Sequence, residues 1–561
     1  MKRIFLTLLW LGLAVGGCTP ADKPELDPPA QPPGPGPETP ATGEYNLTGK
    51  VVDMSGKGLE GVVVSDGTQC TATLSDGTYS MKVDPSSVKF IFISTPSGYR
   101  PTVSGGRPVF YRSLASQSLK DGIYTIDTFK LTPVENPDRA TVFFTADPQP
   151  RAGTAGYDNI GYHSLDCCED LYRDLAETAA GITGRQVFGV CLGDIVHENM
   201  DLYKNYIAGL KKLGYPTYNV LGNHDNNPSA ANDDSAATEF ESYFGPRNYS
   251  FNVGKIHFVV LDNLIMKDKS GRLTGYDQGL TDKIWEWLQA DLSFVPKTAT
   301  VATCSHSPMF KTLNGERSAR HKDDYANLLT GFAKVHAWAG HTHETHNFVY
   351  PASHKYSGVE VHTLARSTGE LWTNEYLSSG TPRGYTIVEI ENGDFVSWRF
   401  HPLKYQTGKY VGTGTQPPYV FRDWDYDGDG VAKMRNGAGV LGESYQMHVY
   451  PPVGTYGDSK VYVNVFLWDN MWSKPVFTLD GGAPVEMTPV ESTSRYDFAD
   501  TEFKTFYKTY NSTMAGDSGY KASTTASPNT LFSTPVGATT GSGTVSVTDR
   551  FGNVYTGKVS W

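Results

Sequence analysis

The sequence contains little cysteine, and what it has argues against a disulfide framework. Only six of the 561 residues are cysteine. Cys167 and Cys168 are adjacent, an arrangement that rarely pairs without strain, and no two cysteines stand in C-x-x-C spacing. Cys191 and Cys304 lie in apolar runs, which is typical of small core residues. We therefore expect a fold that is held together by its cores.

An excess of basic residues is also lacking. The 48 Lys and Arg residues are outnumbered by 60 Asp and Glu residues, which gives a formal net charge of −12. Proteins that hold nucleic acid by its phosphates depend on clustered Lys and Arg. The composition therefore argues against a general nucleic-acid binder. An anionic substrate should be small, or be held by a locally positive site such as metal ions.

The N-terminal apolar run is too short to span a bilayer. It extends from Ile4 to Val15 and follows Lys2 and Arg3, a pattern typical of a secretory signal. The small residues before Cys18 resemble a bacterial lipobox. This implies a lipoprotein signal peptide over residues 1–17 and lipidation of Cys18. Residues 18–43 are rich in proline and predict an extended linker. We expect an exported lipoprotein, anchored in the bacterial outer membrane at its periplasmic face or the cell surface.

The remaining residues divide into three regions by their patterning. Residues 44–133 and 406–561 alternate apolar and polar positions between short turns, which predicts a β-sandwich in each. The first of these resembles the transthyretin-like, carboxypeptidase-regulatory-like fold. Residues 139–401 alternate buried strand-like runs with amphipathic helical patterns, which predicts an α/β domain. The expected fold class is therefore multidomain, α/β plus all-β.

Polar signatures follow five of the strand-like runs of the α/β region. In order along the chain they are Asp147-Pro148-Gln149, Gly193-Asp194, Gly222-Asn223-His224-Asp225, Ser305-His306-Ser307-Pro308 and Gly340-His341-Thr342-His343. Loops that follow parallel strands meet at the carboxyl edge of the sheet, so these residues can converge. Carboxylate, amide and imidazole groups without thiolate suit divalent Mn, Fe or Zn.

The order of these signatures resembles the calcineurin-like metallophosphoesterase superfamily. With a β-sandwich before and after, the chain is similar to its exported lipoproteins with accessory domains at both ends. The resemblance implies a central αββα domain with two divalent ions, Mn, Fe, Zn or Mg. It assigns Asp147, Gln149, Asp194 and His343 to one ion, and Asp194, Asn223, His306 and His341 to the other.

One predicted ligand departs from the family pattern. The family usually has histidine where this chain has Gln149, and an amide oxygen is a harder, neutral ligand. The ion at this position is therefore expected to bind more weakly, or to be Mn or Mg in preference to Zn. Alternatively, Gln149 only forms a hydrogen bond near Asp147.

The resemblance also implies a mechanism, in which a metal-bridging hydroxide attacks phosphorus and His224 acts as general acid. Relatives orient this histidine with a carboxylate three residues after the bridging aspartate. His197 stands at that position here, so Asp225 and Glu198 are the candidate partners. Trp372 and Arg383 follow the last motif and are candidates for substrate contact, although core packing of Trp372 is an equal alternative.

We expect a phosphoesterase that hydrolyses a small phosphate ester, with a phosphodiester slightly favoured over a phosphomonoester. Its second expected partner is the membrane, through the N-terminal lipid anchor. The alternative is a surface lipoprotein that binds a glycan or a protein through an inactive phosphoesterase core. That alternative predicts no metal uptake, whereas every expected ligand position carries a chemically competent side chain.

Overall fold

The structure is a computed structural model that describes residues 45–151, 164–310, 318–369, 377, 379–405, 424–427, 430–435, 437–452, 459–490, 529–537 and 539–561. The signal peptide, Cys18 and the proline-rich linker lie outside these ranges. Among the described residues no helix is long and apolar enough to cross a membrane.

The N-terminal β-rich domain has two sheets that share one core. Buried side chains such as Val51 and Phe129 from the larger sheet are in the same cluster as Val64 and Ile91 from the smaller one. The larger sheet contains β1 (Leu47–Asp53), β4 (Thr78–Met81), β6 (Tyr99–Ser104), β7 (Arg107–Val109), β9 (Ser118–Lys120), β10 (Ile123–Thr125) and β11 (Phe129–Pro133). The smaller sheet contains β2 (Val63–Ser65), β3 (Cys70–Ala72), β5 (Phe90–Ile93) and β8 (Tyr111–Ser113), and is followed by the short helix η1 (Leu114–Ser116).

The central domain is built on two sheets. The first has the order β14-β13-β12-β23-β24, formed by β12 (Ala140–Thr145), β13 (Gln186–Cys191), β14 (Thr217–Asn219), β23 (Gly384–Glu391) and β24 (Asp394–Pro402). The second has the order β15-β16-β19-β20-β22-β21, formed by β15 (Tyr249–Val253), β16 (Ile256–Leu261), β19 (Thr300–Ser305), β20 (Lys334–Ala339), β21 (His346–Val349) and β22 (Val359–Thr363). Phe144 of the first sheet stacks on Trp338 of the second, with ring centroids 4.3 Å apart.

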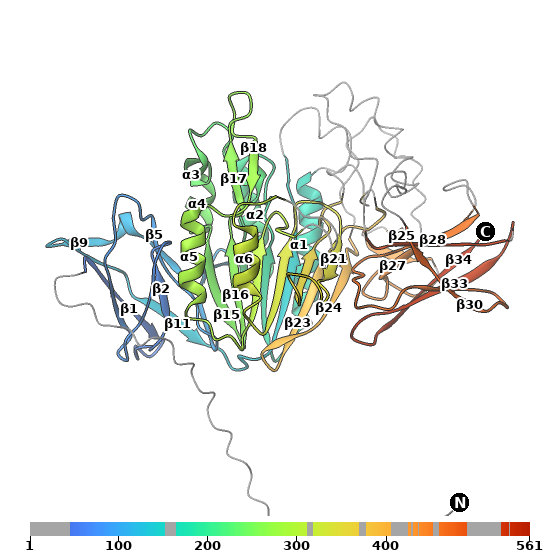
Figure 1. Ribbon diagram of the computed structural model, residues 1–561, viewed down its shortest axis with the longest axis horizontal. Coiled ribbons are helices and arrows are strands. Elements are labelled where there is room, and N and C mark those ends of the chain that lie inside the picture. Colours follow the sequence, from blue (N-terminus) through green and yellow to red (C-terminus); the bar gives the residue numbers. More distant parts are fainter. Residues whose placement is uncertain are drawn as a thin grey trace, which may run out of the picture. The chain divides into compact units, whose positions relative to one another are not determined.

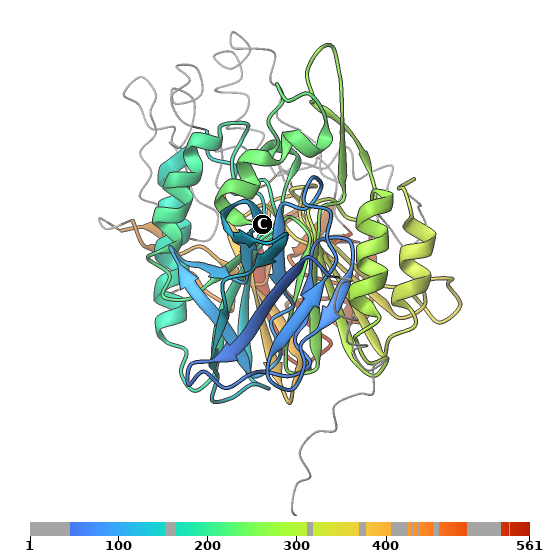
Figure 2. The same cartoon turned by 90° about the vertical axis from the view of Figure 1, so that its left-hand side faces the viewer.

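Helices cover the outer faces of both sheets. Figure 2 shows α1 (Ser164–Ala180) on one side of the sheets, and α5 (Asp282–Leu292) and α6 (Lys322–Leu329) on the other. The helix α2 (Tyr203–Leu210) packs beside α1. The sequence favours these helices because their apolar residues recur at helical spacing, as Leu171 and Leu175 do in α1. Thr281 caps α5 by accepting a hydrogen bond from the Ile284 N–H. This αββα arrangement confirms the expected fold class.

The remaining elements of the central domain surround the ends of its strands. They are η2 (Met200–Leu202), η3 (Asn223–Asp225), α3 (Asp233–Ala236), α4 (Thr238–Phe244) and the hairpin of β17 (Leu264–Lys267) and β18 (Gly275–Gln278). Figure 1 shows this hairpin rising beyond the ends of the sheet strands.

Among the described residues, the C-terminal β-rich domain has two sheets of four strands each. One has the order β27-β28-β32-β31, from β27 (Met447–Tyr450), β28 (Lys460–Val465), β31 (Thr488–Pro489) and β32 (Leu531–Pro535). The other has the order β30-β29-β33-β34, from β29 (Val476–Leu479), β30 (Pro484–Glu486), β33 (Ser542–Thr548) and β34 (Val554–Ser560). The short strands β25 (Trp424–Tyr426) and β26 (Ala432–Met434) pair with each other.

Candidate metal centre

The seven side chains expected to bind metal come from five loops at one edge of the central sheets. The buried strands β12, β13, β14, β19 and β20 end at this edge, and each of the five loops follows one of them. The ligand residues lie within four residues of the strand ends. Backbone hydrogen bonds join the loops: Asp147 N–H donates to Gly193 O, Gln149 N–H to Asp194 O, and Gly340 N–H to His306 O. The fold therefore brings residues from 147 to 343 into one site.

The backbone at this site is strained. A non-glycine residue with positive φ is uncommon and costs free energy. Among the described residues ten have such a φ, and six of the ten belong to this site. They are Asp147, Gln149, Asp194, Glu198, His341 and His343, with φ between 40° and 70°. Such strain persists where the surrounding structure enforces it, and here it points the side chains toward a common centre.

Around His306, atoms that accept hydrogen bonds face one another. The Leu192 carbonyl lies 2.8 Å from His306 Nδ1 and accepts its proton, so that in the neutral ring Nε2 carries the lone pair. Nε2 lies 3.1 Å from Asn223 Oδ1, 3.1 Å from His341 Nδ1 and 3.2 Å from Asp194 Oδ2. Asn223 Oδ1 and Asp194 Oδ2 accept hydrogen bonds, and His341 Nδ1 joins them in the tautomer that carries its proton on Nε2. Acceptor atoms at this distance converge favourably only around a proton or a cation.

A second group of ligand atoms shares the same aspartate. Asp147, Asp194 and His343 each place a ligand atom within 4.8 Å of the others, as do Asp194, His306 and His341. His343 Nε2 lies 3.6 Å from Asp147 Oδ1. Asp194 therefore belongs to both groups, and its two oxygens can serve two ions.

Burial and neighbouring charges shift the pKa values in these groups. Burial raises the pKa of Asp147 to about 7, although His306 opposes the shift. Burial alone would lower the pKa of His306, but the charges of Asp194 and Asp147 raise it to about 9. Without an ion, His306 thus carries the positive charge that the carboxylates need. A bound cation would supply this positive charge in place of the protonated imidazole.

Gln149 fits a role as ligand, with its amide turned. Its amide nitrogen donates a hydrogen bond to Asp194 Oδ2, whereas its Oε1 is buried with no hydrogen-bond partner. A rotation of the amide by 180° exchanges these two atoms, and their assignment follows from the surrounding network. After the rotation Oε1 joins the converging acceptors. The alternative expected from the sequence, in which Gln149 only forms a hydrogen bond near Asp147, corresponds to the amide as it stands, bonded to Asp194.

Three family models match the chain. "N terminal of Calcineurin-like phosphoesterase" matches residues 45–133, "Calcineurin-like phosphoesterase" matches 140–345, and "C terminal of Calcineurin-like phosphoesterase" matches 362–555. The chain belongs to the calcineurin-like phosphoesterases. It is a hydrolase of phosphoric esters from a family that uses divalent metal ions, which confirms the enzyme class and the accessory domains expected from the sequence.

Solved structures with similarity to this phosphoesterase share little sequence with it. Purple acid phosphatase PPD1 from yellow lupin (Lupinus luteus) is 14% identical with a TM-score of 0.35, over 61% of this chain and 67% of that one. A putative 5'-nucleotidase from Staphylococcus aureus is 12% identical with a TM-score of 0.28, over 47% of this chain and 54% of that one. No curated protein sequence matches the chain.

His224 lies at the rim of the phosphoesterase centre, and the structure distinguishes its two candidate partners. Glu198 Oε1 lies 3.5 Å from His224 Nδ1. Asp225 instead accepts hydrogen bonds from the N–H groups of Ile195 and Gly222, and so fastens the loops that carry Asp194 and Asn223. Glu198 is therefore the residue placed to orient His224.

His197 stands at the position where relatives have the orienting carboxylate, and it has a different place here. Its ring stacks on that of His224, with centroids 4.1 Å apart and 24° between the planes. Burial lowers the pKa of His197 to about 3, which keeps the ring neutral. A neutral stacked ring restricts the movement of His224 without adding a second positive charge beside it.

Arg383 has buried contacts with other parts of the domain, and its expected contact with substrate stays a prediction. Its side chain is buried, donates a hydrogen bond to the Tyr405 carbonyl 2.8 Å away and lies 3.5 Å from Asp170 of α1. It therefore ties α1 to the chain after β24. Trp372 lies outside the described residues, so its expected contact with substrate stays a prediction.

Two further residues reach the centre without a motif in the sequence. Arg366 is fully buried, and its Nε–H donates to the Asp147 carbonyl at 3.0 Å. The Tyr276 hydroxyl lies 2.6 Å from His341 Nε2. Neither residue is near a signature in sequence, and only the fold places them.

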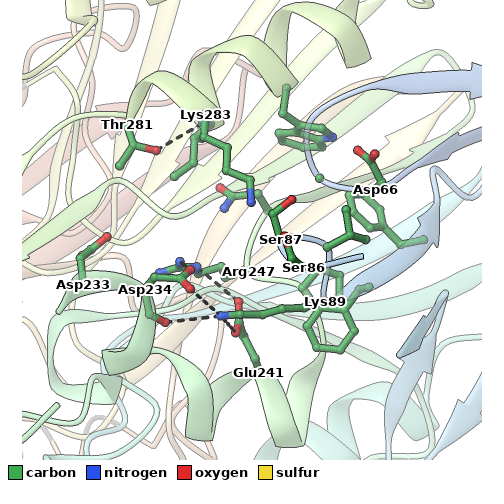
Figure 3. A pocket seen from close by; sticks show the side chains of 18 residues that line it. Asp66, Ser86, Ser87, Lys89, Asp233, Asp234, Glu241, Arg247, Thr281 and Lys283 are labelled. Atoms are coloured by element: carbon green, nitrogen blue, oxygen red, sulfur yellow. Dashed lines mark hydrogen bonds and ion pairs between the residues drawn. The ribbon is translucent and has the colours of Figure 1, made fainter. Parts of the chain in front are cut away.

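A separate hollow of about 430 Å³ lies where the N-terminal domain meets the helices α3 to α5. Figure 3 shows Lys89 pointing at Asp234 and Glu241, at 3.0 and 2.8 Å. Arg247 contacts the same two carboxylates, at 2.6 and 3.4 Å. The residues that line the hollow come from both domains and include none of the expected metal ligands, so the hollow is separate from the centre.

Another group of potential metal ligands lies on β20 and β22. His336, Glu360 and His362 offer ligand atoms close together, but both Glu360 oxygens are taken by the Arg550 guanidinium, at 2.6 and 3.3 Å. His336 Nδ1 and His362 Nε2 are 3.0 Å apart and share a hydrogen bond. Burial lowers the pKa of both rings, so the pair is neutral. Arg550 already supplies the positive charge at this position.

Proposed function

We propose that the chain is a two-metal phosphodiesterase, exported and tethered to a membrane. The observation that carries the two-metal part is the position of Asp194, which belongs to both groups of converging ligand atoms. One ion would be held by Asp147, Gln149, Asp194 and His343, and the other by Asp194, Asn223, His306 and His341. When bound, divalent ions acidify a water molecule and offset the charge on a phosphate ester.

The side chains proposed to take part in proton transfer are His224 and Glu198. A leaving alkoxide needs a proton, and His224 is at the rim of the centre with its Nδ1 toward Glu198. The carboxylate fixes the ring, so that Nε2 can present a proton to the departing oxygen. Asp225 holds the two loops that set the distance between His224 and Asp194.

An open rim supports a diester as the substrate. The side chains of His224, His343 and Glu198 are 26%, 24% and 36% exposed, whereas Asp147 and His306 beneath them are fully buried. The buried ligands fix the phosphate position, and the exposed rim leaves room for a second ester arm to extend into solvent. A single general acid is sufficient, because only one of the two ester bonds breaks.

The test compares two substrates on the protein stripped of metal and then supplied with Mn²⁺. We expect bis(p-nitrophenyl) phosphate to be hydrolysed faster than p-nitrophenyl phosphate, and only with Mn²⁺ present. His341→Ala should abolish turnover. His354→Ala, in the turn between β21 and β22, is the matched control and should leave turnover unchanged. A preference for the monoester would overturn the diesterase assignment, and activity of His341→Ala would overturn the metal assignment.

The proposed tether rests on the N-terminal sequence. Lys2, Arg3 and the following apolar run favour export, and the small residues before Cys18 favour acylation. In a bacterial host the full chain should fractionate with membranes and incorporate labelled palmitate, and Cys18→Ser should do neither. Membrane association of Cys18→Ser would contradict this part of the proposal.

A further inference from the structure

The β17–β18 hairpin is fastened at its base to the loop that carries His306. Asn263, just before β17, donates a hydrogen bond from Nδ2 to the Ser307 carbonyl and accepts one from the Ser307 N–H at 3.2 Å. Gln278, at the end of β18, donates from Nε2 to the Pro308 carbonyl. Both strand ends are therefore held against the residues that directly follow His306.

Further along, the hairpin contacts the loop region of His224. The Leu273 N–H donates to the Pro228 carbonyl at 2.9 Å, and Arg272 Nη2 lies 3.9 Å from Glu198 Oε2. The Met266 N–H donates to Asp233 Oδ1 at 2.6 Å. The hairpin thus spans two loops of the centre, and its position relative to both is set by bonds along its length.

Tyr276 projects from β18 to the metal ligand His341. Its hydroxyl lies 2.6 Å from His341 Nε2, and the two rings meet edge to face at 5.6 Å. The other ring nitrogen of His341, Nδ1, lies 3.1 Å from His306 Nε2. The tautomer that leaves Nδ1 unprotonated carries its proton on Nε2, and this N–H donates to the Tyr276 oxygen.

We propose that Tyr276 is a positioning residue, which holds His341 so that Nδ1 faces the point where His306, Asn223 and Asp194 converge. The inference rests on the proposed two-metal function and names a residue outside the motifs. Metal-bound histidines generally donate their second N–H to a fixed acceptor, which sets the tautomer and the ring orientation. Because Tyr276 is part of a hairpin fastened beside His306, the same element aligns both imidazoles.

Tyr276→Phe tests this role because it removes the hydroxyl and keeps the ring. Calorimetric titration of the metal-free protein with Mn²⁺ should show two ions bound to the wild type. In the variant, one of them should bind more weakly by about 10- to 100-fold. Turnover at low Mn²⁺ should fall to a similar extent, and excess Mn²⁺ should restore kcat, because the site is misaligned rather than lost.

Tyr325→Phe is the matched control. Tyr325 lies in α6 and donates its hydroxyl hydrogen to Thr303 Oγ1 in the core, at 2.7 Å. The control loses a buried hydrogen bond in the same domain, so it should lower the melting temperature and leave both Mn²⁺ affinities unchanged.

Two results would overturn the role of Tyr276. The first is a Tyr276→Phe protein with wild-type affinity for both ions, and the second is a loss of kcat that excess Mn²⁺ does not restore. If the wild type itself binds no Mn²⁺, the proposed two-metal function fails instead, so the two failures can be told apart.

Discussion

At the scale of single residues, variants of His224 and Glu198 can distinguish proton transfer to the leaving group from metal binding. His224→Ala should keep both ions and lose about 10²- to 10⁴-fold in kcat, the usual contribution of a general acid. Glu198→Gln should cost less, since it removes the orienting charge and leaves the imidazole. Single-turnover rates with alkyl and with p-nitrophenyl leaving groups measure the difference, which should be largest for the poorer alkyl leaving group.

The control for this comparison is Glu239→Gln, a carboxylate in the first turn of α4. It should leave both kcat and KM unchanged. Equal losses for alkyl and p-nitrophenyl substrates in His224→Ala would show that His224 binds the ester and does not protonate its leaving group.

Gln149 supplies the second prediction at this scale. Replacing its amide by imidazole, as in Gln149→His, should tighten binding of one ion and shift the metal preference toward Zn²⁺, because imidazole is the softer ligand. Gln149→Ala should weaken the same ion by at least about tenfold. Competition between Mn²⁺ and Zn²⁺ at equilibrium measures both effects. An unchanged affinity in Gln149→Ala would leave Gln149 as a hydrogen-bond donor to Asp194 only.

The ligand-type residues could be predicted from the sequence because each follows a recognisable buried strand within a few residues. The buried contacts of Arg383 could not be predicted from the sequence, since its partner Asp170 is 213 residues away on α1. The same holds for Tyr276, which is 65 residues from His341. Contacts of this kind depend on how elements pack, and nothing in the local pattern around Tyr276 marks it.

At the scale of elements, α1 is joined to β24 by a charged contact. His401 of β24 lies 2.9 Å from Asp174 of α1 and 3.6 Å from Glu443. Burial would lower the pKa of His401, but the two carboxylates raise it above its ordinary value. The contact with His401 in turn lowers the pKa of Glu443 to about 2.

This contact makes part of the stability depend on pH. The raised pKa of His401 contributes stability that is complete below about pH 6.5, and is lost as pH rises through the folded pKa. The lowered pKa of Glu443 contributes stability above about pH 4.3, lost as pH falls toward 2. His401→Gln should therefore reduce the free energy of unfolding most between about pH 4.3 and 6.5.

The loss should be on the order of 1 kcal/mol, since the Glu443 side chain is 42% exposed and solvent screens its share. Denaturant unfolding of the wild type and His401→Gln at pH 5.5 and pH 8.5 gives the comparison, with His354→Gln as the control. A deficit that grows with pH would have the wrong sign for this contact.

The spacing of apolar residues in the sequence predicts the α/β core and both β-rich domains, but it does not predict the β17–β18 hairpin. Its strands are four residues each, Leu264–Lys267 and Gly275–Gln278, and the residues between them include a single larger apolar one, Leu273. Such short runs carry too little alternation to identify a strand. The hairpin forms because its ends are bonded to the loops around it, as Asn263 is to Ser307.

At the scale of the whole molecule, the expected metal ions should stabilise the fold. Asp147 and Asp194 are fully buried and close together, so metal-free protein contains two acidic groups in one dry site. An ion that binds only the folded state adds about 2.7 kcal/mol at 100 times its Kd. Mn²⁺ should therefore raise the melting temperature of the metal-free protein.

Asp147→Asn tests whether Mn²⁺ raises the melting temperature by binding at this centre or by a non-specific effect on the protein. The variant removes one buried acid, so its metal-free form should melt at a higher temperature than the metal-free wild type, and Mn²⁺ should raise its melting temperature much less. Differential scanning calorimetry with and without Mn²⁺ measures all four states. A metal-free Asp147→Asn protein that melts lower than the wild type would show that the carboxylate is stabilising as it stands.

The pairing of β23 with β12 limits how this protein can be divided. The central family match ends at residue 345, yet β21, β22, β23 and β24 complete the two central sheets from beyond that point. A fragment that stopped at residue 345 would leave β12, whose six residues are all buried, as an open sheet edge prone to aggregation. Residues 362–402 therefore belong structurally to the central sheets, although the C-terminal family match begins at residue 362, and a division of the protein that keeps these sheets whole must lie beyond Pro402.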